Sequence, residues 1–375
     1  MEGHTAVPED MAVGPPLWYM TVSMAAPEHS GAFCDALLPK VSRTFAICIR
    51  LLPPGLDHSV LVAYLLCRIA DTIEDSTALD QTSKERLLLA FGQAVGDPRD
   101  PAESVQEAFP NPTSDEERLA HHANLVLQEF RQLSETQQVA IRPWVQEMSR
   151  GMAEFTRRKG AARAAQLEAL GTVAELDRYC YIVAGTVGHL LTELFYLHSG
   201  TWSRARYDRL TARATSFGLG LQLTNIIKDV ADDRRRGWSF VPQELCQLAG
   251  ITPDELHDGR HTAAALRVMH LLIAKAKSHL LDALEYSTLL SHRQYGIRLF
   301  CLTSLYFAVQ TLHLAERDDR LLDPDHKVKI TRPEVLRTIA MSRIVAPSNA
   351  AVRWYFRRLA GAAWSREPIP AVPAT

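Results

Sequence analysis

Y-L-L-C-R-I-A-D-T-I-E-D, residues 64–75, is an apolar stretch with helical spacing that ends in three carboxylates. Asp71, Glu74 and Asp75 stand at positions i, i+3 and i+4, so on a helix they share one face. Two like charges about 4 Å apart repel by roughly 4 kcal/mol at a protein surface, so an inward-facing cluster of this kind calls for a cation. A single acidic cluster is more often a solvated helix face. If the cluster is a binding site, its oxygen ligands suit Mg²⁺, which normally bridges carboxylates to substrate phosphates.

A second acidic stretch favours the interpretation of the first cluster as a cation-binding site over that of a solvated helix face. Q-L-T-N-I-I-K-D-V-A-D-D, residues 222–233, places polar side chains at spacings of three and four: Gln222, Asn225, Asp229, Asp232 and Asp233. Apolar residues occupy the other sides of this helix. Two inward acidic stripes on separate helices can hold a metal-bound diphosphate between them, as helical bundles build sites in their core.

Five sequence blocks carry a family resemblance. They are V-S-R-T-F (41–45), the stretch 64–75, Y-C-Y-I-V-A-G-T-V-G (179–188), the stretch 222–233 and F-V-P-Q-E (240–244). In their order and rough spacing, from about residue 36 to residue 345, they resemble the squalene and phytoene synthases, and a bacterial squalene synthase most. The resemblance implies an all-α isoprenoid synthase bundle with a central active-site cavity, in which two prenyl diphosphates are joined head to head.

Composition and length are compatible with one large domain. The chain has 375 residues, 47% hydrophobic and 22% charged, with a net charge of −2, so no global field attracts nucleic acid. The acidic stretches lie on opposite sides of a proline-rich loop at 96–114, and a domain boundary there would split the site. We therefore expect a poorly ordered segment at 1–27, one catalytic domain at 28–362 and a proline-rich tail at 363–375.

Cysteine use and hydropathy indicate the compartment. The six cysteines lie mostly in apolar helical stretches without a C-x-x-C pair, which is typical of a reducing environment. We find no signal peptide, and no apolar run reaches the ~18 residues of a membrane span; the nearest, 299–312, contains Thr303, Ser304 and Gln310. Eukaryotic squalene synthases end in a hydrophobic anchor, whereas this chain ends in R-E-P-I-P-A-V-P-A-T. We expect a cytoplasmic bacterial enzyme, a monomer or weak dimer, that contacts membrane at most peripherally to release its product.

Helical periodicity dominates the chain, and we find no convincing alternating strand. The predicted helices, some of them broken, cover about 29–38, 42–51, 57–76, 82–95, 115–158, 172–199, 203–235, 261–290, 293–316 and 331–360.

The resemblance implies roles for the polar residues of these blocks. The metal would be held by Asp71, Glu74, Asp75, Asn225, Asp229 and Asp233. The substrate diphosphate would be bound by Ser42, Arg43, Arg68, Gln222 and Lys228. For Arg68 the competing interpretation is a simple i, i+3 ion pair with Asp71.

Tyr179 is the predicted catalytic residue beside the acids Asp71, Asp75, Asp229 and Asp233, because the matching tyrosine of the family is implicated in the first half-reaction. A buried tyrosine is otherwise more often a core residue. Gly185 and Gly188 would let a ligand or another helix approach. Aromatic and aliphatic side chains would wall the carbocation and exclude water, namely Phe45, Tyr64, Val183, Val187 and Leu191.

One block departs from the family. Where relatives have arginine before the P-Q element, this chain has R-R-R-G-W-S-F at 234–240, with Trp238 at an arginine position. Either one of the three preceding arginines supplies the phosphate contact, or the triplet neutralises Asp232 and Asp233.

The reductant would be NADPH. No Rossmann fingerprint is present, but H-K-V-K-I-T-R at 326–332 resembles a segment of squalene synthases, in which Lys327, Lys329 and Arg332 could meet nucleotide phosphates. The alternative is a solvated basic turn. Phe300 and Cys301 also resemble squalene synthases more than phytoene synthases.

The predicted function is therefore a Mg²⁺-dependent prenyltransferase, squalene synthase. It would condense two farnesyl diphosphates to presqualene diphosphate and reduce this with NADPH to squalene. The alternatives are a phytoene or dehydrosqualene synthase, which needs no reductant, a relative that prenylates a small aromatic acceptor, and an isoprenoid-binding protein without activity.

Overall fold

The computed structural model describes residues 29–97, 99–159, 168–361 and 364. The predicted terminal segments, 1–27 and 363–375, lie outside the described residues, except for Trp364, and so does the side chain of Arg43.

The described part of the N-terminal half forms eight helices: α1 (Ser30–Val41), α2 (Arg43–Ile49), α3 (Leu56–Asp75), α4 (Gln81–Gly96), α5 (Glu103–Ala108), α6 (Asp115–His121), α7 (Ala123–Gln132) and α8 (Glu135–Lys159). Side-chain caps fix several starts, since Asp80 accepts from Ser83 N at 2.7 Å and Ser114 from Glu117 N at 3.1 Å. The predicted helix 115–158 is three helices, and the predicted loop 96–114 contains the short helix α5.

The C-terminal half contributes α9 (Val173–Cys180), the π-helical turn η1 (Tyr181–Gly185), α10 (Thr186–Ser199), α11 (Arg204–Arg235), α12 (Gln243–Leu248), the 3-10 turns η2 (Glu255–His257) and η3 (Gly259–His261), α13 (Thr262–Leu289), α14 (Tyr295–Ala315), α15 (Arg332–Val345) and α16 (Asn349–Ala360). The sequence-based expectation of no strand is wrong in one detail. Two-residue strands β1 (Glu168–Ala169) and β2 (Trp238–Ser239) pair in parallel.

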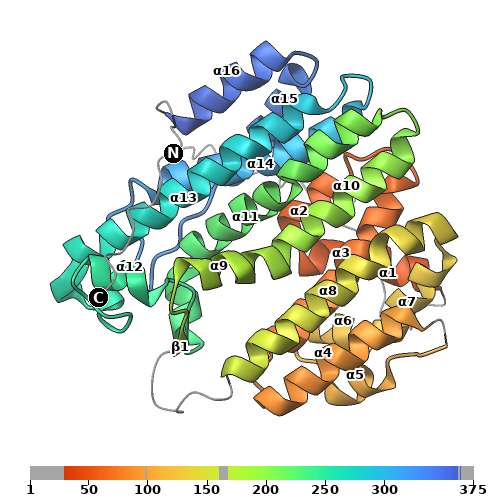
Figure 1. Cartoon of the computed structure of the whole chain (residues 1–375), viewed down its shortest axis with the longest axis horizontal. Helices are drawn as coiled ribbons and strands as arrows, with labels where there is room; N and C mark the ends of the chain where they lie inside the picture. Colours follow the sequence, from red (N-terminus) through yellow and green to blue (C-terminus); the bar gives the residue numbers. More distant parts are fainter. Residues whose placement is uncertain (1–28, 98, 160–167, 362–363, 365–375) are drawn as a thin grey trace, which may run out of the picture.

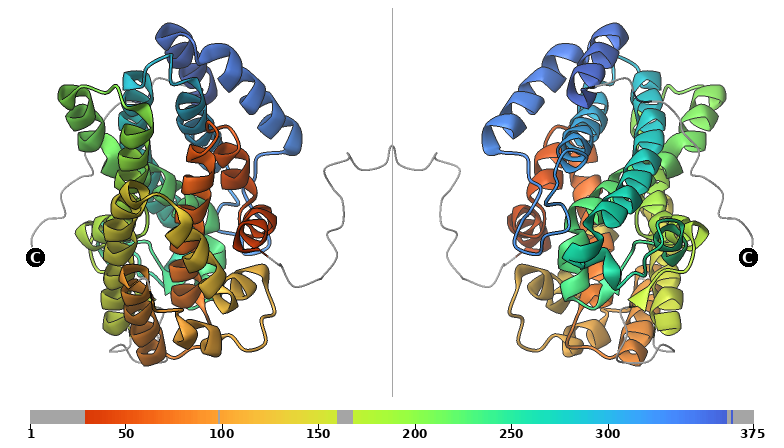
Figure 2. Two further views of the ribbon diagram at one scale, coloured as in Figure 1. Left: turned by 90° about the vertical axis from the view of Figure 1, so that its right-hand side faces the viewer. Right: turned by 90° about the vertical axis from the view of Figure 1, so that its left-hand side faces the viewer.

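The helices pack into an elongated bundle in which α11, α13 and α14 lie side by side and α3 and α8 continue the bundle toward α4 and α7 (Figure 1). Figure 2 shows that α15 and α16 lie on the outside of this bundle, at one corner. One continuous hydrophobic cluster runs from Phe33 to Ala360. The prediction of an all-α helical bundle is confirmed.

The close approach of α10 to α11 depends on glycines. A Cβ on Gly188 would collide with the backbone of Ala214, and one on Gly218 would collide with the backbone of Ala184. The sequence left open whether a ligand or a helix approaches Gly188, and the structure places a helix there.

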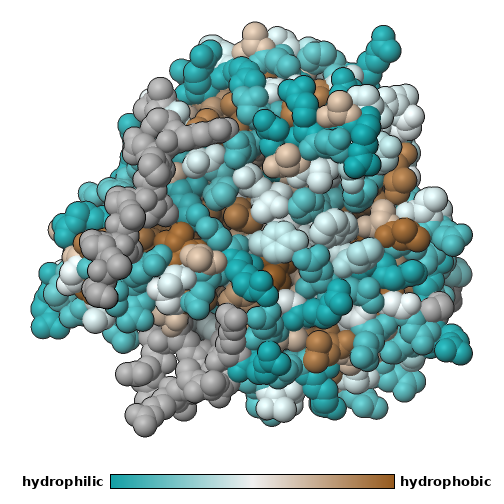
Figure 3. All heavy atoms as spheres, viewed as in Figure 1, coloured by the Kyte–Doolittle hydropathy of each residue, from teal (hydrophilic) through white to brown (hydrophobic). Residues whose placement is uncertain are grey.

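Two helical segments, Val173–Ser199 and Tyr295–Ala315, are long and apolar enough to cross a membrane. In α14, 83% of the apolar stretch is buried inside the bundle, as expected for a core helix. Figure 3 shows that the face of the molecule seen in Figure 1 is mostly hydrophilic, with apolar residues scattered over it.

Candidate functional site

The first acidic cluster occupies the last turn of α3. Glu74 is buried, Asp75 is exposed, and the Asp71 side chain is 32% exposed. Burial raises the pKa of Asp71 to about 7, with Asp75 and Glu74 adding to the rise and Arg68 opposing it. The turn therefore concentrates negative charge that the adjacent arginine only partly offsets.

The second acidic cluster lies at the end of α11. The Asp233 side chain is only 14% exposed. The pKa of Asp233 is raised to about 7, first by burial and then by the charges of Asp229 and Asp75, against the effect of Arg236. Asp75 comes from α3 and lines the same cavity as Asp233, so the two clusters face each other.

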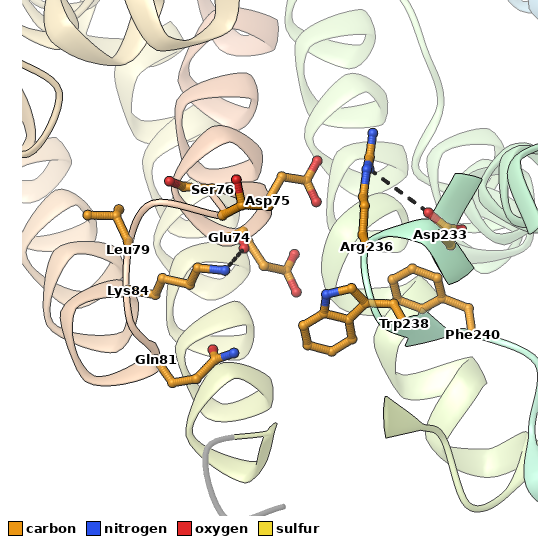
Figure 4. Close-up of a pocket in the computed structure, with 11 residues that line it drawn as sticks. Glu74, Asp75, Ser76, Leu79, Gln81, Lys84, Asp233, Arg236, Trp238 and Phe240 are labelled. Atoms are coloured by element: carbon orange, nitrogen blue, oxygen red, sulfur yellow. Dashed lines mark hydrogen bonds and ion pairs between the residues drawn. The ribbon is translucent and has the colours of Figure 1, made fainter. Parts of the chain in front are cut away.

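A cavity of about 270 Å³ separates the two helix ends. Its lining comes from α3, α4, the end of α11 and the β2 segment, and consists of Glu74, Asp75, Ser76, Thr77, Leu79, Gln81, Lys84, Asp233, Arg236, Trp238 and Phe240. In Figure 4 the carboxylates of Glu74 and Asp75 point across the cavity toward Arg236 and Trp238, and Asp233 lies on the far side. The structure thus brings two acids of the first stripe and one of the second to the same cavity.

Two basic residues lie at opposite walls of this cavity. Lys84, from α4, is buried and donates its Nζ to the Glu74 carbonyl at 2.7 Å. Arg236 lies 4.0 Å from Asp233. Sequence reasoning missed Lys84, although its position one turn before the buried Leu87 and Leu88 marks a lysine on an inward helix face.

The three consecutive arginines have separate partners. Arg234 donates to the Asp254 carbonyl at 2.9 Å, and Arg235 pairs with Asp232 at 2.7 Å. Only Arg236 lines the cavity. Arg235 and Arg236 lie within ion-pair distance of Asp232 and Asp233, as the neutralising interpretation expects, and a phosphate contact stays a prediction for Arg236.

Tyr179 is buried next to the first acidic cluster. Its ring stacks on Phe240, a cavity residue, with centroids 4.6 Å apart, and meets Phe155 edge-on at 5.4 Å. The pKa of its phenol is raised well above the ordinary value, first by burial and then by the nearby carboxylates Glu74, Asp75 and Asp71. The phenol therefore stays protonated and can donate a hydrogen bond.

The remaining expected diphosphate contacts are spread more widely. Arg68 lies 3.7 Å from Asp71 and 3.3 Å from Glu116, so part of its charge serves a second acid. Lys228 pairs with Asp229. Gln222 is half-buried and Asn225 is exposed, farther back along α11.

The residues expected to wall the substrate chain are half-buried on the inner sides of α2, α3, η1 and α10: Phe45, Tyr64, Val183, Val187 and Leu191. Phe45 stacks on Tyr64 at 5.7 Å and meets Phe300 at 6.4 Å. Ser42 caps α2 by accepting from Phe45 N at 3.2 Å, so its hydroxyl oxygen already has a structural task.

The carboxylates fit a metal that is completed by substrate. Among the described residues, no three His, Cys, Asp or Glu side chains converge into a ready-made metal site. The convergence expected for the α3 acids is therefore looser than their spacing predicts, because Glu74 is turned inward while Asp75 is exposed. Such a donor set suits Mg²⁺, which binds through one or two carboxylates plus substrate phosphates.

The basic segment at 326–332 lies beside the same end of α11. Lys327 pairs with Asp232 at 2.5 Å, and this contact is the first cause of the lowered pKa of Asp232. Lys329 and Arg332 are exposed, and within the described residues neither is in an ion pair. One cation of the segment is thus in an ion pair and two are exposed, and their contact with nucleotide phosphates stays a prediction.

Comparisons with known proteins agree with this architecture. The squalene/phytoene synthase family model matches residues 38–334. Squalene synthase 1 of Arabidopsis thaliana is 29% identical over 323 residues, covering 85% of this chain and 73% of that protein. Squalene synthase of Nicotiana benthamiana is 31% identical over 289 residues, covering 76% and 64%. The chain spans slightly under two thirds of several other curated relatives, 63% for the Dictyostelium discoideum squalene synthase.

Solved structures show the same fold. The complex of TcSQS with the ligand BPH1237 has a TM-score of 0.74 and 26% identity, covering 90% of this chain and 94% of that one. A dehydrosqualene synthase in complex with ligand has a TM-score of 0.58 and 19% identity, covering 88% and 97%. The family match, the helical bundle and the facing acidic clusters lead to one conclusion: the chain belongs to the squalene/phytoene synthase family.

Proposed function

We propose that the protein is a squalene synthase, a transferase that joins two farnesyl diphosphates head to head and reduces presqualene diphosphate to squalene. The observation that carries the proposal is the cavity shared by Asp75 of α3 and Asp233 of α11. The similarity to proteins named squalene synthase, at 28 to 31% identity, supports the choice of product. The catalytic unit is the single domain expected at residues 28–362.

The acids of the two helix ends form the diphosphate site. Asp71, Glu74, Asp75, Asp229 and Asp233 would hold Mg²⁺, with Asn225 one turn before Asp229. Bound Mg²⁺ would draw negative charge onto the leaving diphosphate. The protein's own part is to hold these carboxylates against their mutual repulsion, which a bound cation relieves.

Cationic side chains of the chain complete the diphosphate contacts. Arg236 and Lys84 face the cavity from its two walls, so we add them to Arg68 and Lys228 as binding residues. An arginine offers a planar fork that matches two phosphate oxygens. These charges stabilise the diphosphate most as it leaves, which is when its charge develops.

Tyr179 donates a hydrogen bond to the leaving diphosphate and helps to stabilise the carbocation, and the apolar side chains exclude water. Because its pKa is raised, Tyr179 donates to the diphosphate oxygen as that leaves, and its ring with Phe240 presents a π face to the cation. The half-buried wall of Phe45, Tyr64 and Leu191 keeps water from capturing the cation.

NADPH would supply the hydride of the second half-reaction. Lys329 and Arg332 are the residues that would meet its phosphates, while Lys327, through Asp232, holds their segment against the end of α11. The cytoplasmic location and the monomer or weak dimer stay predictions.

The deciding experiment is product analysis with the purified full chain. Farnesyl diphosphate and Mg²⁺ are expected to give presqualene diphosphate without NADPH and squalene with it. A dehydrogenated C30 product that forms regardless of NADPH would replace the proposal with dehydrosqualene synthase. Reaction only with geranylgeranyl diphosphate would indicate phytoene synthase. Binding without any turnover would indicate a carrier protein.

A further inference from the structure

The outer sides of α15 and α16 form a surface that the proposed chemistry does not use. We define this outer surface by Leu336, Arg337, Arg343, Ile344, Trp354 and Arg357, all exposed. Leu336 is 68% exposed, Ile344 69% and Trp354 51%. Leu336 and Ile344 are the two most exposed large hydrophobic residues in the described part of the chain. Leu336 and Ile344 are eight positions apart on α15 and so share one face of that helix, and adjacent exposed apolar residues, unlike scattered ones, indicate an interaction site.

The inner sides of both helices are already committed to the bundle. Thr338 of α15 donates to Gln310 of α14 at 2.9 Å, and Tyr306 of α14 donates to the Val352 carbonyl of α16 at 3.1 Å. Fully buried Arg298 of α14 donates to the Ala346 carbonyl at 2.6 Å and to the side chain of Asn349. The two helices are therefore fixed in place, and only their outer sides are available to a partner.

The order of residues around α15 is that of an interfacial helix. At about 100° per residue, Arg343, Leu336, Ala340, Ile344 and Arg337 follow one another over an arc of roughly 120°. The arginines therefore flank an apolar centre. On α16, Trp354 lies between Arg357 and Arg358 in the same projection. Long cationic side chains beside an apolar strip can reach phosphates while the strip enters an apolar phase.

Charge on this surface departs from that of the whole chain. Residues 332–361 contain six arginines and one acidic residue, Glu334, in a protein of net charge −2. Glu334 is occupied in the capping box with Thr331, and Arg353 pairs with Glu285 at 2.7 Å. Within the described residues, no carboxylate lies in ion-pair distance of Arg337, Arg343, Arg357 or Arg358. The uncompensated charges complement an anionic surface.

We propose that this outer surface docks onto an anionic lipid bilayer, with Leu336, Ile344 and Trp354 entering the headgroup boundary and the arginines contacting lipid phosphates. A nucleic acid would leave the apolar centre unused, whereas a bilayer satisfies both features at once. In both views of Figure 2, α15 and α16 form one outer corner of the molecule.

Docking here would place the membrane one helix away from the bundle interior. α14 packs against α15 and α16 and also against α2, α11 and α13. The acidic cavity lies near β1, toward the opposite end of the molecule in Figure 1, and stays in water for diphosphate entry.

The test is vesicle flotation of the purified full chain, without substrate, so that its result is independent of the proposed activity. We expect binding to vesicles of phosphatidylcholine with about one third phosphatidylglycerol, little binding to phosphatidylcholine alone, and release by salt at about 1 M, where the Debye length is about 3 Å. Arg337→Gln with Arg343→Gln should weaken binding about 25-fold, since each basic residue at an anionic surface contributes roughly a factor of five. Leu336→Ser with Ile344→Ser should weaken it at least tenfold.

Matched controls carry the same changes elsewhere. Arg86→Gln with Arg209→Gln removes two exposed arginines, and Leu89→Ser with Val139→Ser removes two exposed apolar residues, 41% and 57% exposed. All variants should keep the wild-type melting temperature and gel-filtration volume. Equal loss of binding in test and control pairs, or no binding of the wild type to anionic vesicles, would overturn the proposal. A wild-type dimer that only the α15 variants dissociate, without vesicle binding, would assign the surface to a second copy instead.

Discussion

At the scale of single residues, similar side chains of the site differ in pKa and in contact partners because their environments differ. Asp71 and Asp233 have raised pKa values because burial and neighbouring carboxylates act together, while Asp232 has a lowered one because Lys327 and Arg235 contact it. Acids one position apart therefore differ in task, and Asp232 holds the basic segment rather than facing the cavity. The three neighbouring arginines differ in the same way, because Arg236 lines the cavity whereas Arg234 and Arg235 contact other residues.

Replacing one acid on each side of the cavity tests the metal assignment. Asp75→Asn and Asp233→Asn should each lower kcat on the order of 10² to 10³, because each removes a charge that acts on the leaving diphosphate. Steady-state kinetics over a range of Mg²⁺ concentrations should also show a higher Mg²⁺ requirement. The exposed Asp319→Asn is the matched control and should leave both unchanged. Unaltered turnover in both site variants would remove the acids from the mechanism.

Neighbouring arginines allow a second comparison. Arg236→Gln should raise the KM for farnesyl diphosphate about tenfold, since a charge-assisted hydrogen bond to phosphate contributes roughly 1.5 to 3 kcal/mol. Arg234→Gln, whose guanidinium donates to the Asp254 carbonyl, should leave KM near the wild-type value. The reverse order of effects would show that Arg234 turns to the substrate in solution.

At the scale of helices, the site depends on the close packing of α10 against α11. This packing positions the helix that carries Asp229 and Asp233 relative to the segment that carries Tyr179. Gly188 of α10 faces the backbone of Ala214 in α11, and Gly218 of α11 faces the backbone of Ala184 in η1, the turn that leads into α10. Side-chain rearrangement cannot relieve such a clash, because the atoms that a Cβ at each glycine would meet belong to the main chain.

Gly188→Ala measures this constraint. The added methyl group would meet the Ala214 backbone and should lower the free energy of unfolding by about 1 to 3 kcal/mol, as overpacking does. Urea denaturation followed by circular dichroism gives the change. Gly259→Ala is the control, because a Cβ at Gly259 meets nothing within 4 Å. Equal stability of the Gly188 variant and the wild type would show that the two helices separate readily.

At the scale of the whole molecule, one hydrophobic cluster connects the site to every layer of the bundle. All six cysteines are buried in it, as the sequence predicted for small core residues. Burial raises the pKa of Cys34 and Cys48 to about 12 and that of Cys246 to about 11. Their protonated, inaccessible thiols report on the integrity of the whole core.

Thiol labelling tests this core. At pH 8 a thiol of pKa about 11 is ionised to roughly one part in a thousand, and the thiolate is the reactive form. The native protein should therefore react with an aromatic disulfide reagent only as fast as it unfolds, whereas six thiols should react in about 6 M guanidinium chloride. Rapid labelling of a native cysteine would contradict the packing described.

The sequence by itself determined the helical class and the two acidic stripes, because hydrophobic period and acid spacing are local properties that a helix converts directly into faces. Helix breaks at 122 and 133–134, and the short helices α5 and α12, were not predicted, since contacts with distant segments decide where such a helix ends. Only the tertiary structure showed that Lys84 and Arg236 line the cavity and that Asp232 pairs with Lys327. It also showed that a helix packs against Gly188. These choices depend on which elements pack together across long sequence separations, and neither the spacing nor the type of a residue encodes its partner.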